Sequence, residues 1–61
     1  MIQINQLSDI VIHYKSGKKH RHNAVTLSQR PGMILDVIRR DGSKFSISAF
    51  AIEKIKVANA K

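Results

Sequence analysis

The clearest structural signal in the chain lies at residues 35–47, which read LDVIRRDGSKFSI. Apolar and polar residues alternate on both sides of Asp41-Gly42, as they do along two strands that bury one face. Asp-Gly is a strong signal for a hairpin turn, because glycine takes the positive φ that such turns need. The stretch therefore predicts two antiparallel strands joined at Asp41-Gly42.

Turn chemistry predicts the register of this hairpin. A three-residue loop, Arg40-Asp41-Gly42, would form a type I turn closed by a left-handed glycine. That loop sets Val37 opposite Phe45, so that the large apolar side chains share one face. A two-residue loop would set Ile47 opposite Asp36 and bury the carboxylate, which is costly, and we reject it.

A similar pattern occurs at residues 10–19, which read IVIHYKSGKK and align with residues 35–44 at a shift of 25. The glycines coincide, and so do the alternating apolar positions. Further on, Ala24 aligns with Ala49, so each copy reads as strand, glycine turn, strand and small apolar corner. Chance similarity between two ordinary hairpins is the alternative explanation. Both explanations predict two successive hairpins.

The first hairpin is expected to follow the same turn logic as the second. Lys15-Ser16-Gly17 becomes its loop, and this sets Ile12 opposite His20 and Ile10 opposite His22. The two histidines then lie beside isoleucines at the border of the core. We expect a partly buried polar edge there.

Weaker signals assign the remaining segments. Residues 18–25 are expected to form a polar strand, and residues 28–32 a loop, since Pro-Gly is strong punctuation. One short helical turn is expected near residues 49–52, before a last strand over residues 52–57. A short helix over residues 48–57 is the alternative, but its β-branched residues favour the strand.

These elements predict an all-β fold, namely a small antiparallel five-stranded barrel or curved sheet. The pattern resembles that of SH3-like barrels loosely over residues 9–57, and the resemblance implies no function for any residue. Phe50 is expected to be buried, as is Phe45. The predicted core contains Ile10, Ile12, Leu35, Val37, Phe45, Ile47 and Ile55.

The length of 61 residues predicts a single domain over residues 1–61, with a frayed tail at residues 59–61. A core this small is marginal, and without cysteine there is no disulfide to support it. Good turns, self-association or a ligand would have to compensate. The N-terminus lacks the pattern of a signal peptide, and no apolar run approaches the roughly 20 residues of a membrane helix. We therefore expect a cytoplasmic protein.

The charge balance indicates the class of partner. Eleven Lys and Arg face four Asp and Glu, which gives a net charge of +7 and a pI near 10.4. A pI above about 9 is typical of nucleic-acid-binding domains. A membrane partner is not expected, because no basic amphipathic helix is evident.

The basic residues cluster around the two predicted hairpin tips. The predicted nucleic-acid-binding residues are Lys15, Lys18, Lys19, Arg21, Arg39, Arg40 and Lys44, with Tyr14 as the one stacking residue. Lysines there could contact phosphates and make binding salt-dependent. Protection of edge strands against aggregation is the other common use of lysine. DNA and RNA both stay open.

Catalysis and cofactor binding have little support. Without cysteine and with four scattered acids, no nucleophile, base and orienting group can be proposed. His13 would join His20 and His22 only in the two-residue register, and no carboxylate lies nearby in sequence to support a zinc site. We expect no enzyme, no metal and no cofactor.

Two function classes remain. The first is a small basic nucleic-acid-binding accessory or regulatory protein, of the kind that phages or plasmids carry. The alternative is a protein-binding modulator, an inhibitor or adaptor that docks on an acidic surface of a larger enzyme or complex. Salt dependence of binding to duplex, single-stranded DNA and RNA would separate them.

Overall fold

The computed structural model of the chain describes residues 3–58, so the predicted frayed tail at residues 59–61 lies outside the described residues. In chain order the elements are β1 (Gln3–Tyr14), β2 (Lys19–Arg30), β3 (Ile34–Arg39), β4 (Lys44–Ser48), the short 3-10 helix η1 (Ala49–Ala51) and β5 (Ile52–Val57). All pairings are antiparallel, in one sheet of order β4-β3-β2-β1-β5. The predicted all-β class, helical turn and last strand are confirmed.

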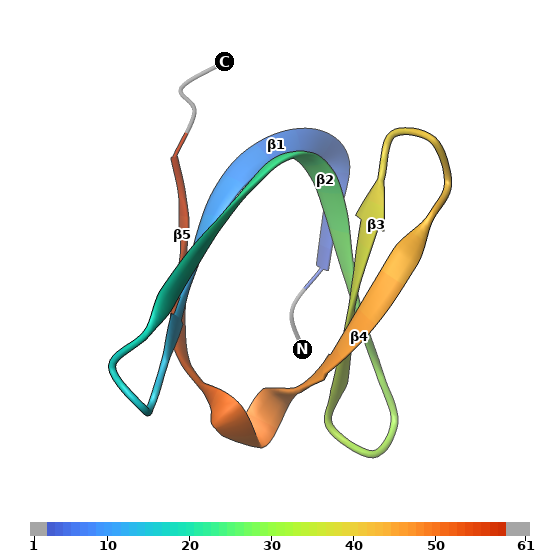
Figure 1. The fold of residues 1–61 in the computed structure, drawn as a ribbon. Helices are drawn as coiled ribbons and strands as arrows, with labels where there is room; N and C mark the ends of the chain where they lie inside the picture. Colours follow the sequence, from blue (N-terminus) through green and yellow to red (C-terminus); the bar gives the residue numbers. More distant parts are fainter. Residues whose placement is uncertain (1–2, 59–61) are drawn as a thin grey trace.

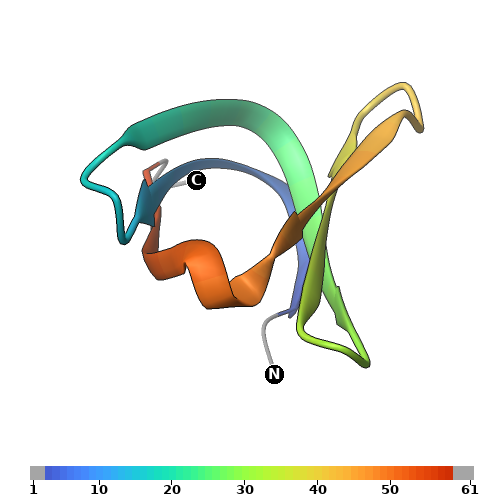
Figure 2. The same ribbon diagram turned by 60° about the horizontal axis from the view of Figure 1, so that its bottom comes forward.

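The sheet is strongly curved. The long strands β1 and β2 bend together into an arc, and β3 and β4 continue from the far end of β2 (Figure 1). The chain then crosses through η1 and returns along β1 as β5 (Figure 2). The strand order leaves β4 and β5 as the two edges of the sheet. The predicted curved five-stranded antiparallel sheet is confirmed, and its form is consistent with an SH3-like barrel.

A bulge in β2 helps to bend the paired strands. Opposite Asp9 of β1, β2 has two residues, Asn23 and Ala24, and Ala24 has a φ of 56°. The Ala24 N–H donates a hydrogen bond of 2.9 Å to the Asp9 carboxylate, which replaces a partner lost from the ladder. Ala49, by contrast, begins η1. Ala24 and Ala49, the aligned corner residues of the two copies, therefore differ in structure, and the predicted repeat does not extend to this corner.

The two hairpin tips do have the same geometry. The Gly17 N–H donates to the Tyr14 carbonyl at 2.9 Å, and the Gly42 N–H donates to the Arg39 carbonyl at 3.0 Å. The φ angles of the two glycines are 96° and 91°. In each tip the residue after the glycine closes the loop with a hydrogen bond of 2.8 Å. The predicted three-residue loops are confirmed at both tips.

The strand registers within the two hairpins are also as predicted. Val37 lies opposite Phe45, and Ile12 lies opposite His20. The expected loop over residues 28–32 is wrong, because β2 continues to Arg30 and the turn covers residues 31–33. Pairing with β3 satisfies the backbone of this polar stretch, which local turn preference could not reveal.

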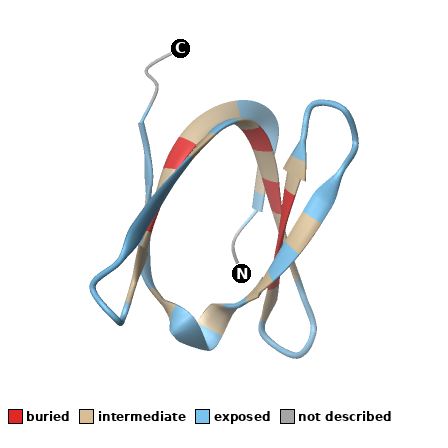
Figure 3. Cartoon of the chain, viewed as in Figure 1, coloured by how far each residue is buried: buried red, intermediate tan, exposed pale blue. Residues whose placement is uncertain are grey.

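The core lies along the concave side of the arc, where the buried positions belong to β1, β2 and β3 (Figure 3). Its fully buried side chains are Ile10, Ile12, Val25, Leu27, Leu35 and Val37. Phe45, Ile47 and Ile55, which were expected in the core, are half-buried against it. Val25 and Leu27 were not expected there. Phe50 was expected to be buried and is 66% exposed.

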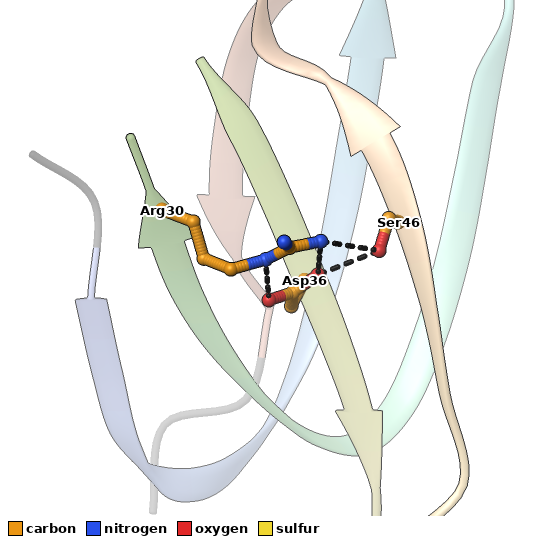
Figure 4. A network of polar contacts seen from close by, with 3 residues as sticks. All are labelled: Arg30, Asp36 and Ser46. Atoms are coloured by element: carbon orange, nitrogen blue, oxygen red, sulfur yellow. Dashed lines mark hydrogen bonds and ion pairs between the residues drawn. The ribbon is translucent and has the colours of Figure 1, made fainter. Parts of the chain in front are cut away.

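One polar group is buried on the outer side of β3. Asp36 is 3% exposed and receives hydrogen bonds from Arg30 Nε at 2.7 Å and from the Ser46 hydroxyl at 2.6 Å (Figure 4). These two donors, Arg30 first, hold the pKa of Asp36 below its usual value. The carboxylate thus faces Ser46 rather than Ile47, and it links β2, β3 and β4.

Candidate nucleic-acid interface

The structure divides the predicted binding residues into two groups. Lys15 and Lys18 lie exposed at the tip between β1 and β2, whereas Arg40 lies at the tip between β3 and β4. The two tips lie on opposite sides of the molecule in both views (Figures 1 and 2). The predicted residues therefore do not form one continuous surface.

A row of basic side chains crosses three neighbouring strands near the first tip. Val11 and His13 of β1 point to the outer face, because the alternating residues of this strand are buried in the core. His13 lies between Lys19 of β2 and Lys54 of β5. Since neighbouring strands are about 4.8 Å apart, the two lysines flank the imidazole closely.

A second basic row lies beside the first on the same face. Val11 has Arg21 opposite it on β2 and Lys56 opposite it on β5. We call the four cations of these two rows, Lys19, Arg21, Lys54 and Lys56, the basic ladder. All four are exposed.

The ladder has few compensating acids. Arg21 lies 3.8 Å from the Asp9 carboxylate and also donates to the Asn23 side chain at 3.0 Å. Within residues 3–58, the three lysines of the ladder form no ion pair. Burial, and then repulsion from the nearby lysines, lowers the pKa of His13 below its ordinary value of 6.5.

Like charges that lie close together on one face repel one another, so the ladder is unfavourable in the isolated fold. A polyanion along this face would relieve the repulsion. Protection of sheet edges against aggregation is a competing explanation. The strand β5 is an edge, and the part of β2 that carries Lys19 and Arg21 is also open on one side, because β3 pairs with residues 25–30 of β2. The two explanations differ in what neutralising the ladder does to binding.

The surroundings of the second tip, between β3 and β4, differ from those of the basic ladder. Arg39 packs over the Phe45 ring, with the guanidinium carbon 4.9 Å from the ring centroid, and this contact restrains the arginine. A shallow hollow of about 410 Å³ beside it is lined by Asn23, Ala24, Arg39, Arg40 and Asp41. Lys44 lies on the outer face, opposite Ile38. The carboxylate of Asp41 makes this tip less uniformly basic than the ladder.

A row of rings runs along the concave side. Tyr14 packs against His20 with centroids 5.4 Å apart, His20 against His22 at 6.3 Å, and His22 against Phe45 at 5.1 Å. Tyr14 is half-buried and already has a ring partner, so it offers less free surface for stacking than the sequence suggested. Burial, His20 and Arg39 together lower the pKa of His22.

Sequence reasoning missed Lys54 and Lys56. Their alternation with Ile55 was visible, but a helix over residues 48–57 stayed open, and nothing local indicated that β5 would pair with β1. It also missed Phe50, whose exposure depends on how η1 crosses the fold. These three residues adjoin the first tip rather than the second.

Other kinds of site find no residues to support them in the described part of the chain. No group of three or more His, Cys, Asp and Glu side chains there could hold a metal ion. Over residues 3–58, no helix is long and apolar enough to cross a membrane. The absence of enzymatic activity and of a cofactor stays a prediction.

Comparisons of the chain with models of protein families, with curated proteins and with solved structures return no match. The functional argument therefore depends on the geometry and charge of the described residues.

Proposed function

We propose that this chain is a small nucleic-acid-binding accessory protein, and that the basic ladder contacts the phosphates. The observation that supports the proposal is the register of β2, β1 and β5, which sets Lys19 and Lys54 on either side of His13. Lys15 and Lys18 extend the same basic surface to the first tip. The net charge of +7 would add long-range attraction to a polyanion.

Such binding has a measurable salt dependence. Each neutralised phosphate releases condensed counterions, and the logarithm of the binding constant falls with the logarithm of salt by about 0.7 per contact on single strands and about 0.9 on duplex. Four ladder contacts would thus give a slope of about −3 on single strands and somewhat steeper on duplex.

The experiment compares two charge-neutralising double variants by fluorescence anisotropy with labelled oligonucleotides at several salt concentrations. Lys19→Gln with Lys54→Gln removes one row of the ladder, and we expect the slope to become shallower by about 1.4 on single strands and about 1.8 on duplex. Arg40→Gln with Lys44→Gln makes the same change in net charge at the second tip and serves as the control. Circular dichroism verifies that each variant is folded.

An equal loss of affinity in both double variants would show that only net charge matters and would contradict the ladder. Complete absence of binding by the wild-type chain to DNA and RNA would contradict the proposed function as a whole. The alternative, a modulator that docks on an acidic protein surface, rests on the same cations and has no further observation of its own.

A further inference from the structure

Among the described residues, the most exposed large apolar side chain is the aromatic ring of Phe50. Phe50, the middle residue of η1, is 66% exposed, compared with 55% for Val57, 45% for Leu7 and 41% for Met33. Single exposed apolar residues are common on protein surfaces, so exposure alone does not indicate a site. The argument therefore depends on what holds Phe50 and on what lies beside it.

Hydrogen bonds hold η1 at both ends. The Ala49 N–H donates to the Met33 carbonyl at 2.7 Å, and the Ala51 carbonyl accepts from the Lys15 N–H at 3.0 Å. The Phe50 N–H itself donates to the hydroxyl of Ser48, the N-cap residue of η1, at 3.3 Å. The turn is thus tied to the β2–β3 turn and to the first tip. The backbone that carries the ring is therefore already ordered, so its ordering adds little to the cost of binding a ligand.

The 3-10 helix η1, which carries Phe50, lies next to the first tip, at the end of the strands that carry the basic ladder. Below the ladder, Tyr14 of β1 still pairs with Ile52 of β5, and the next residue, Lys15, is bonded to Ala51. Phe50 therefore lies just beyond the last paired position of β1 and β5, beside the first tip. The first tip contains two exposed lysines, Lys15 and Lys18.

An exposed aromatic ring beside a track of cations matches the requirements of single-stranded nucleic acid. Bases without a pairing partner stack on aromatic side chains, while lysines follow the phosphates. A duplex keeps its bases stacked inside the helix, so it offers no free base to stack on the ring. We infer that, given the proposed function, the ligand is single-stranded, with one base stacked on Phe50 and the adjoining phosphates on Lys15 and Lys18.

The test uses the full chain and three labelled probes: a single-stranded DNA, the RNA of the same sequence, and the DNA duplex. Stacking is worth about 1–3 kcal/mol per base, so Phe50→Ala should weaken single-strand binding about 5- to 150-fold and leave duplex binding unchanged. Val57→Ala, which trims another exposed apolar side chain, is the matched control and should change neither.

A tryptophan supplies a direct readout, because the chain contains none. Phe50→Trp keeps an aromatic face and should retain single-strand affinity. Its fluorescence should be quenched when a base stacks on the indole. An oligonucleotide with abasic sites should bind wild type and Phe50→Ala equally and should leave the tryptophan unquenched.

Several results would overturn the inference. Phe50→Ala could leave single-strand affinity unchanged, or weaken single-strand and duplex binding equally. Phe50→Ala could instead change only the oligomeric mass of the protein measured by sedimentation, which would show that the ring forms a contact between protein chains. If Lys19→Gln with Lys54→Gln still weakens binding in those cases, only the inference fails; if that variant also has no effect, the proposed function fails with it.

Discussion

The two hairpin tips allow one substitution to be made twice in equivalent surroundings. Gly17 has a φ of 96° and Gly42 a φ of 91°, and a Cβ built on either would find no heavy atom within 4 Å. The Cβ of a substituted valine therefore meets no neighbouring atom at either site. The whole effect should come from the backbone, since a β-branched residue is poorly tolerated at positive φ.

The expected cost follows from that conformation. An L-residue in the left-handed region costs about 1–2 kcal/mol relative to glycine. The entropy of unfolding is about 2.1 cal/mol/K per residue, so for 61 residues each kcal/mol lowers the Tm by about 8 °C. Gly17→Val and Gly42→Val should each lower the Tm by about 8 to 16 °C.

Thermal and urea unfolding followed by circular dichroism would measure both variants. Gly→Asn at the same positions is the control, and it should be milder at each because asparagine tolerates positive φ. A harmless Gly17→Val beside a destabilising Gly42→Val would refute the reasoning. The first tip would then be a flexible loop, and Lys15 and Lys18 would lie on a mobile arm rather than on a fixed surface.

Two further predictions concern the bulge and the histidines. Ala24→Gly should stabilise the fold by up to about 1 kcal/mol in urea unfolding, because the alanine has positive φ; a loss of stability, as glycine usually causes in a strand, would contradict the strained bulge. In the folded chain the pKa values of His13 and His22 lie below the ordinary 6.5. As the pH falls, the unfolded chain therefore binds protons at a higher pH than the folded chain does. Stability should be complete above about pH 6.5 and fall as the pH drops towards the folded pKa values. His22→Gln should flatten this dependence below pH 6.5, and an unchanged profile would exclude His22 as a cause.

Much of the hairpin geometry could be predicted because it depends on neighbours in sequence. Asp41-Gly42 and Ser16-Gly17 select the loops, and alternation then determines which residues face the core. The same reasoning stopped β2 too early, at Val25, because residues 28–30 are polar and precede Pro-Gly. Only their pairing with β3 makes them a strand.

The candidate site was less predictable, since its parts come from distant segments. Lys19 and Arg21 were among the predicted binding residues, and both are exposed. Their neighbours Lys54 and Lys56 could not be assigned until β5 was known to lie beside β1. The two tips are alike in conformation yet lie apart, so equivalence in sequence did not place their cations on one surface.

The sequence by itself determined the two hairpin turns, the strand phase and the excess of positive charge, because each depends on local conformational preference or on composition. Tertiary structure decided which strands are neighbours. The bulge that helps to bend β1 and β2 is held by the Asp9 side chain, which accepts a hydrogen bond from the Ala24 N–H fifteen residues further along the chain. That curvature, and the path of the chain from β4 to β5, set Lys54 beside His13 and leave Phe50 exposed next to Lys15. Contacts over such separations carry no local signal, and they are what turns scattered cations into a surface.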